Sequence, residues 1–505
     1  MKKIRTKRTI TQKLLGGGMK ALKLLPHVQK KINEEYGNIL EELEKMAKPY
    51  NKNLPLVKSI PEQGWEKREI IDLMEGLNRR EENRWKEGYV SGAVYHGGEE
   101  HLNFLNGIYA LNSQSNPLHS DLWPSTIKYE SEIVAMTAEM FHANDIKNDN
   151  PVFGGRVCGN VTSGGTESIL LAMKTYRDWG RKERGIKKPE MVVPVTAHAA
   201  FEKAGQYFNI KVVKIPVDKD YKADTEKAKS AITRNTVVLV GSAPGFPHGI
   251  IDPLPELSEI ALKRKIGFHV DACLGGFILP WAEKLGYSVP VFDFRLPGVT
   301  SISADTHKYG YAAKGSSVIL YRGEALRRYQ YFKTTEWPGG LYFSPTFAGS
   351  RPGGLSAVCW ASLVSMGKKG YTEATDKILK TAGIIKEGIK SISELFIFGD
   401  PLWVIAFGSA NLDIYRILDY MNEKKWSLNG LHYPEAVHIC VTLRHTLPGV
   451  PERFIADLKD AVKHVRGNPR DKGKMAPIYG MAAGLPDRSM IAELMDQYMD
   501  LLYSF

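Results

Sequence analysis

From about residue 150 onward, short apolar runs alternate with segments of helical periodicity such as ESILLAMKTYRDWGRKE and LPELSEIALKRK. Strands buried on both faces of a parallel sheet are continuous apolar runs, and crossover helices join them. The alternation therefore predicts an α/β domain with a largely parallel sheet. The strands are expected at residues 191–195, 210–217, 236–242, 266–272, 299–304 and 316–321.

Three regions of different composition divide the chain. Residues 1–60 form a basic segment with helical patterning, and residues 61–365 form a large domain that contains the alternating pattern. Residues 366–505 predict a smaller α+β domain, because the amphipathic stretch GYTEATDKILKTAGIIKEGIKSI precedes short strands such as LWVIAFGS. A further helix is expected at 66–87.

The net charge of +12 is concentrated at the N-terminus. Residues 1–31 contain ten lysines and arginines and no acidic residue, whereas the remainder is nearly balanced. This distribution argues against a nucleic-acid-binding surface spread over the whole protein. The segment is either a solvated arm or a contact for a polyanion such as an anionic membrane surface.

The cysteines and the hydropathy favour a soluble, cytoplasmic protein without a metal site. The four cysteines are scattered and form neither a CxxC pair nor a zinc-binding spacing. We find no run of about 18 apolar residues that would predict a transmembrane helix. The N-terminus lacks the apolar core and the cleavage site of a secretory signal.

The stretch NVTSGGTESI at 160–169 is typical of a turn that leads into a helix. Its glycines allow the backbone to approach a ligand closely, and the free N–H groups of a helix N-terminus bind phosphate. The stretch lacks the Lys-Ser/Thr pair of a P-loop. A Ser/Thr helix cap beside a tight turn is the alternative interpretation.

Two ionisable residues follow apolar runs that predict buried strands. Asp271 ends the run FHVD, where an unpaired carboxylate would be costly, so it either has a positive or hydrogen-bonding partner or caps the next turn. Lys308 follows the next run, SISA. Burial would lower the pKa of Lys308 and provide the neutral amine that Schiff-base chemistry requires; an ordinary surface lysine is the alternative.

These three motifs together fit one cofactor. A phosphate-binding turn, an aspartate for a pyridinium nitrogen and a Schiff-base lysine are the anchors of pyridoxal 5'-phosphate (PLP). Asp271 and Lys308 follow expected strands, and ligands of parallel sheets bind near the carboxyl ends of the strands. His198 also follows an expected strand, where its imidazole would either stack on the cofactor ring or have a structural role.

The motifs TSGGTESI, HVDACLGGF, SISADTHKYGYAAKGSS and FAGSRPGG resemble those of the sphingosine-1-phosphate lyases. These enzymes belong to the PLP-dependent group II decarboxylase-like family of fold type I, the aspartate aminotransferase-like fold. The similarity extends from SGAVY at 91–95 to DLLYS near the C-terminus, which covers most of the chain and leaves only residues 1–60 unplaced. As a set, the motifs are highly specific.

The resemblance implies cofactor contacts. Lys308 is then the Schiff-base lysine, Asp271 pairs with the pyridine nitrogen, and His198 stacks on the ring. Ser350 reaches the phosphate of the neighbouring subunit's cofactor, so the active site is shared across a homodimer. The other residues expected to hold the cofactor phosphate are Gly165, Thr166 and His307.

The resemblance also implies a site for the substrate phosphate. Lys314, from the KGSS segment, is expected to supply the positive charge, since a phosphate needs several donors and at least one cation. Its expected companions are Tyr95, Asn116, His119 and Tyr479. Taken singly, the two tyrosines also suit core or interface positions, and His119 also suits a loop cap.

The activity implied by the resemblance is a retro-aldol cleavage of phosphorylated sphingoid bases to a fatty aldehyde and phosphoethanolamine. The general base is left open among His119, Lys314, Lys308 and the cofactor phosphate. An amino-acid decarboxylase of the same fold is the closest alternative, because it would share every cofactor contact. A non-catalytic protein that binds nucleic acid or membranes through the basic arm would leave Asp271 and Lys308 unexplained.

Overall fold

The computed structural model describes residues 26–51, 54, 56–146, 150–471, 473 and 489–504. Two compact units can be distinguished among the described residues: 84–469 form one, and those between 26 and 83 together with those from 470 onward form the other. The expected first helical piece and Tyr479 lie outside the described residues.

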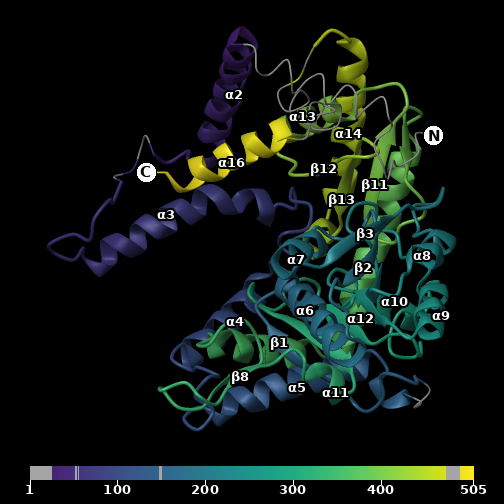
Figure 1. The fold of residues 1–505 in the computed structure, drawn as a ribbon. Helices are drawn as coiled ribbons and strands as arrows, with labels where there is room; N and C mark the ends of the chain where they lie inside the picture. The colour runs from purple at the N-terminus through teal and green to yellow at the C-terminus, as the bar shows by residue number, and fades with distance from the viewer. Residues whose placement is uncertain are drawn as a thin grey trace. The chain divides into compact units, whose positions relative to one another are not determined.

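A seven-stranded sheet forms the centre of the larger unit (Figure 1). Its order is β1-β7-β6-β5-β4-β2-β3, and all neighbouring pairs are parallel except those of β7 with β1 and β6. The strands are β1 Val157–Thr162, β2 Glu190–Pro194, β3 Lys211–Ile215, β4 Thr236–Ser242, β5 Gly267–Asp271, β6 Ser301–Ala304 and β7 Ser317–Arg322. The largely parallel α/β sheet and all six expected strands are confirmed.

The sequence pattern missed β1. Its residues, VCGNVT, include a glycine and an asparagine and do not form an apolar run. Gly159 is required there, because a Cβ atom would lie 2.2 Å from the carbonyl oxygen of Ile319 on the neighbouring strand. Because close backbone packing requires a glycine here, the strand lacks the continuous apolar run by which buried strands are recognised in a sequence.

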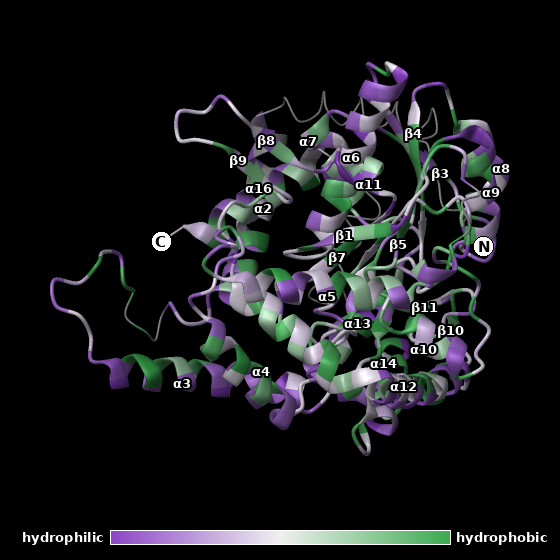
Figure 2. Ribbon diagram, turned by 90° about the horizontal axis from the view of Figure 1, so that it is seen from below, coloured by the Kyte–Doolittle hydropathy of each residue, from purple (hydrophilic) through white to green (hydrophobic). Residues whose placement is uncertain are grey.

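Helices cover both faces of this sheet. Val238 and Val240 of β4 share a buried cluster with residues of α6, Gly165–Arg184. Gly241 instead faces Leu254 and Leu257 of α9, Leu254–Arg264. Because successive strand residues point to opposite faces, α6 and α9 lie on opposite sides. Figure 2 shows β4, whose residues are all buried, largely in hydrophobic green. The remaining helices of this region are α4 Glu99–Asn112, α5 Pro124–Met140, η1 Ala143–Asp145, α7 Ala200–Phe208, α8 Thr225–Ala231, α10 Leu279–Lys284 and α11 Glu324–Arg327.

A smaller antiparallel sheet with the order β10-β11-β13-β12 follows the long helix α12, Gly353–Lys390. The expected α+β character of this region is confirmed. Gly367, with φ of 57°, breaks α12 beside the boundary that we expect after residue 365. The other elements are β8 Phe332–Thr334, β9 Tyr342–Ser344, β10 Leu395–Ile397, β11 Val404–Ser409, α13 Ile414–Glu423, β12 Asn429–Leu431, β13 Ala436–Cys440, η2 Leu443–Thr446 and α14 Val450–Gly467.

The second unit is helical, as expected. It contains α2 Pro26–Ala47, most of α3 Lys67–Lys86, and α16 Ser489–Tyr503. The side chain of Lys48 donates a hydrogen bond to the carbonyl of Ser504, which ties the end of α2 to the end of α16. In the described part of the chain, no helix combines the length and apolarity needed to cross a membrane.

Candidate active site

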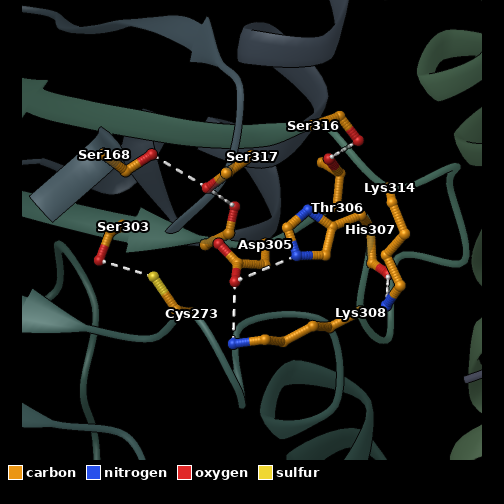
Figure 3. Close-up of polar contacts among 12 residues, drawn as sticks. Ser168, Cys273, Ser303, Asp305, Thr306, His307, Lys308, Lys314, Ser316 and Ser317 are labelled. Carbon is orange, nitrogen blue, oxygen red and sulfur yellow. Dashed lines mark hydrogen bonds and ion pairs between the residues drawn. The ribbon is translucent and has the colours of Figure 1, made fainter. Parts of the chain in front are cut away.

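Lys308 lies in a tight turn directly after β6. The backbone N–H of Lys308 donates to the carbonyl of Asp305, and the N–H of Tyr311 donates to the carbonyl of Lys308. This turn directs the Lys308 ammonium to the Asp305 carboxylate, with 2.9 Å between Nζ and Oδ2 (Figure 3). Lys308 is therefore held by an ion pair with a carboxylate that the sequence pattern did not single out.

Asp305 is the main residue that the sequence interpretation missed. It is 3% exposed, and its Oδ2 also lies 3.7 Å from Nε2 of His307. Burial alone would raise the pKa of Asp305, but attraction to Lys308 and His307 holds that pKa below its ordinary value. The available signal was the position of Asp305 three residues before the lysine, at the end of an expected strand.

The expectation that Lys308 has a lowered pKa was wrong. Burial does favour the neutral amine, but attraction to the Asp305 carboxylate outweighs it and holds the pKa of Lys308 above its ordinary value. Among the described lysines, Lys314 has a lowered pKa, because burial and repulsion from Lys308 lower it to about 8. Without the cofactor, Lys308 is thus a cation.

The expected phosphate-binding turn connects β1 to α6. Gly165 begins α6 and packs so closely on Asp305 that a Cβ atom would lie 2.6 Å from Oδ1 of that carboxylate. Gly164, which precedes the helix, makes no side-chain cap, so the alternative of a Ser/Thr cap is not supported. Glu167 instead accepts a 2.6 Å hydrogen bond from the backbone N–H of Ser163 and so fixes the turn.

The residues around this turn fit the phosphate group of PLP. Nδ1 of His307 is buried and has no hydrogen-bond partner among the residues described. A Cβ atom on Gly164 would lie 3.5 Å from the ring of His307, so the imidazole borders the turn. A helix N-terminus, a glycine cradle and an unpaired ring nitrogen together form an anion site. Thr166 lies exposed in the first turn of the helix.

Asp271 lies at the carboxyl end of β5 and is 7% exposed. Its Oδ1 accepts hydrogen bonds from the backbone N–H of Cys273 at 3.0 Å and from Oγ of Ser303 at 3.4 Å. The expected hydrogen-bonding partner of this carboxylate therefore exists. The ion-pair partner of Lys308 is Asp305 rather than Asp271, which leaves Asp271 for another cation.

His198 follows β2 and starts the turn into α7. Its Nδ1 accepts a 3.1 Å hydrogen bond from the N–H of Ala200, which fixes the ring, and the residue is exposed. The strands β2, β4 and β5 are neighbours in the sheet, so the carboxyl ends that carry His198 and Asp271 lie on the same edge. The geometry suits a ring that covers one face of a ligand at this edge.

Two of the expected substrate residues lie together beside Lys308. Nζ of Lys314 is 4.6 Å from the centre of the Tyr95 ring and 3.5 Å from the carbonyl oxygen of His307. The Tyr95 ring packs edge-on against Tyr309, with 4.8 Å between ring centres. A cation at the face of an aromatic ring is stabilised by the ring quadrupole, and its hydrogens remain available to an anion.

Asn116, His119 and Ser350 form a second group. Oδ1 of Asn116 accepts a hydrogen bond from the N–H of Arg351, next to Ser350, and the carbonyl of Asn116 accepts one from the N–H of His119. Arg351 in turn forms a bidentate ion pair with Glu130 of α5. In the part of the chain that the structure describes, no hydrogen bond or ion pair joins this group to Lys308.

Comparison of the sequence with known proteins gives a matching family model and similar proteins that share one name. Residues 84–407 match the pyridoxal-dependent decarboxylase conserved domain. The chain is 46% identical over 495 residues to the sphingosine-1-phosphate lyase of Arabidopsis thaliana, which covers 97% of this chain and 89% of the relative. It is 40% identical over 485 residues to that of Saccharomyces cerevisiae, covering 95% and 81%.

Comparison with solved structures points to the same group of proteins. The sphingosine-1-phosphate lyase of Burkholderia pseudomallei superimposes with a TM-score of 0.84 at 42% identity, covering 90% of this chain and 99% of that one. The glutamate decarboxylase of Lactobacillus brevis superimposes with a TM-score of 0.70 at 21% identity, covering 84% and 98%, which supports the shared fold only.

Proposed function

This chain belongs to the sphingosine-1-phosphate lyase family of PLP-dependent fold type I enzymes, and we propose that it cleaves phosphorylated sphingoid bases by a retro-aldol reaction. The products would be a long-chain aldehyde and phosphoethanolamine. The observation that carries the proposal is the convergence of Lys308, Asp305 and the turn before α6, with Asp271 on the next strand.

Four features of the chain would hold the cofactor. The turn at Ser163–Gly165 and the ring of His307 would bind its phosphate, and Asp271 would face its ring nitrogen. Lys308 would bind the cofactor as a Schiff base. When bound, PLP accepts the electron pair that is released when the substrate's Cα–Cβ bond breaks. His198 would cover the ring and exclude water.

Asp305 would control the proton on Lys308. With cofactor and substrate bound, the amine of Lys308, whose ammonium form Asp305 stabilises at 2.9 Å, would hold a proton for the substrate's Cα. Lys308 could then return this proton to Cα after bond cleavage. The general base for the substrate's C3 hydroxyl stays open among His119, Lys314, Lys308 and the cofactor phosphate.

The phosphate of the substrate would lie against Lys314 and Tyr95. Lys314 is the cation of this group, and Asn116 and His119 would add hydrogen-bond donors. Tyr479 would complete the set. The combination of Lys314 with Asn116 and His119 favours a phosphate head group over the carboxylate that a decarboxylase removes, because a phosphate needs several donors and at least one cation.

We also propose a homodimer in which the group of Asn116, His119 and Ser350 reaches the neighbouring active site. Leu118, Ile127 and Phe343 line one groove of about 570 Å³ together with Arg351. Phe343 is 72% exposed, and contiguous exposed apolar side chains of this kind mark protein interfaces. A second copy would cover this groove.

For the location, we propose the cytoplasm with peripheral membrane contact through the basic residues 1–31. Cys158, Cys273, Cys359 and Cys440 are all free and buried, which suits a reducing compartment. Sedimentation with anionic and neutral lipid vesicles tests the contact. Binding only to anionic vesicles, weakened by salt, supports it. Equal recovery with both vesicle types would contradict it.

A product assay tests the activity. The PLP-loaded protein is incubated with sphingosine 1-phosphate, and phosphoethanolamine and the long-chain aldehyde are quantified. Equal amounts of both products support the proposal, and Lys308→Ala should abolish them. Carbon dioxide release from amino acids, with no aldehyde from the phosphorylated sphingoid base, would favour the decarboxylase instead.

A further inference from the structure

A continuous line of buried, hydrogen-bonded side chains leads from Tyr176 to Asp271. The hydroxyl of Tyr176 on α6 lies 2.6 Å from Oγ of Ser301, and this Oγ lies 2.8 Å from Nδ1 of His269. Nε2 of His269 lies 3.2 Å from Oγ of Ser303, which lies 3.4 Å from Oδ1 of Asp271. All of these residues except Asp271 are 0% exposed.

The direction of each hydrogen bond in this line can be deduced from its carboxylate end. An ionised carboxylate only accepts, so the single hydroxyl proton of Ser303 points to Asp271. Nε2 of His269 must then donate to Ser303. Burial lowers the pKa of His269 to about 4, so the imidazole is neutral and its Nδ1 accepts from Ser301.

Ser301 has given its proton to His269, so it accepts from the hydroxyl of Tyr176, which itself lies 2.6 Å from Oγ1 of Thr300 and must accept from it. Every hydroxyl and ring N–H in the line therefore donates toward Asp271. Ser303 also accepts from the thiol of Cys273 at 3.2 Å, so it receives two hydrogen bonds and donates one. This matches the capacity of a hydroxyl group. Figure 3 shows the contact between Ser303 and Cys273.

The packing of α6 on β5 makes this line possible. Gly267 opens β5, and a Cβ atom there would lie 2.2 Å from the Tyr176 ring. The glycine thus allows the ring to lie directly on the strand, which brings its hydroxyl to Ser301. The same helix begins at Gly165 in the proposed phosphate turn. One helix would therefore fix the two ends of the cofactor relative to each other.

We propose that His269 is a positioning residue, which, through Ser303, orients Asp271 and stabilises its charge toward the cofactor's ring nitrogen. Tyr176 and Ser301 fix the tautomer of His269 in this arrangement. Hydrogen bonds to an ionised group are stronger than neutral ones, and a buried network strengthens them further. The inference rests on the proposed contact of Asp271 with that nitrogen.

The experiment uses the holoenzyme reconstituted with PLP that carries nitrogen-15 in its ring. The ring-nitrogen resonance reports its protonation and hydrogen bonding, and a PLP titration of the apoprotein gives the affinity. The variants are Ser303→Ala, Tyr176→Phe, His269→Asn and His269→Gln. The matched control is Tyr321→Phe, because Tyr321 is equally buried and its hydroxyl lies 3.2 Å from Thr175 of the same helix, outside the line.

We expect Ser303→Ala to shift the nitrogen resonance toward that of an unprotonated ring and to weaken PLP binding about tenfold. Tyr176→Phe should cause a smaller shift of the same sign, and Tyr321→Phe none. His269→Gln should retain more of the wild-type signal than His269→Asn, because only the longer side chain places an N–H near Ser303.

An unchanged resonance and affinity in folded Ser303→Ala and Tyr176→Phe would overturn the proposal. An equal change in Tyr321→Phe would also overturn it, since the effect would then be general. A wild-type protein that binds no PLP would instead contradict the proposed cofactor contacts, so the two failures are distinguishable.

Discussion

Two opposing effects act on Lys308, and their magnitudes decide its charge. Its side chain is 23% exposed, so burial costs less than the shift of about 3–5 pKa units seen for fully buried groups. Attraction between unit charges about 4 Å apart is on the order of 4 kcal/mol at an effective dielectric constant of about 20. With Asp305 at 2.9 Å, the attraction outweighs burial and the amine stays protonated.

Asp305→Asn should therefore lower the pKa of Lys308 and speed the attachment of PLP near neutral pH. One pKa unit raises the fraction of neutral amine about tenfold, and only the neutral amine is nucleophilic. Stopped-flow absorbance after mixing apoprotein with PLP measures the rate. Turnover should fall at the same time, because Lys308 no longer holds its proton. An attachment rate equal to wild type in a folded variant would contradict the role of Asp305.

The pKa of Lys314 predicts an upper pH limit for substrate binding. Its pKa of about 8 means that the free enzyme loses this cation as the pH rises through that value. We expect kcat/KM to fall about tenfold per pH unit above it, because the substrate phosphate then meets a neutral amine. Lys314→Arg should extend the plateau to higher pH, since a guanidinium stays charged. Identical profiles for the two enzymes would exclude Lys314 as the titrating group.

At the scale of elements, the start of α6 depends on a glycine for packing rather than for conformation. A Cβ atom on Gly165 would meet Oδ1 of Asp305 at 2.6 Å and Sγ of Cys273 at 2.8 Å, and both groups are buried. Neither can move aside without disturbing Lys308 or β5. The close approach therefore couples the helix N-terminus to the carboxylate that holds the lysine.

Gly165→Ala should weaken PLP binding by at least about tenfold, because α6 must retreat from the phosphate. Gly383→Ala in α12 is the control, since a Cβ atom there has nothing within 4 Å. An alanine within a helix should stabilise that variant by up to about 1 kcal/mol. PLP titration and thermal unfolding measure the two effects, and similar PLP affinities for both variants would refute the packing argument.

At the scale of the molecule, no hydrogen bond or ion pair among the described residues joins the two groups of proposed substrate residues. Lys314 and Tyr95 lie beside Lys308, whereas Asn116 and Ser350 are tied to Glu130 through Arg351. The second group borders the groove that contains the exposed Phe343. A closed twofold dimer would let each chain complete the active site of the other.

Mixing two inactive variants tests the shared site. Lys308→Ala and Asn116→Ala are refolded together, so that about half of the dimers are hybrids with one intact site each. We expect recovery of about a quarter of wild-type turnover. No recovery, with hybrid dimers detected by mass spectrometry, would place both residues in one chain's site. Phe343→Asp should weaken the dimer, which light scattering would detect.

The sequence by itself determined the sheet and the cofactor motifs. Six strands were apolar enough to be recognised, Asp271 and Lys308 follow two of them, and the glycine-rich turn before α6 was recognised from its own residues. Only the tertiary structure revealed β1, whose glycine packs against the neighbouring backbone, and Asp305, whose carboxylate reverses the expected pKa shift of Lys308. The periodicity of a sequence indicates which side chains are buried. The charge state of Lys308 and the hydrogen bonds that lead from Tyr176 to Asp271 depend instead on which buried groups meet across strands.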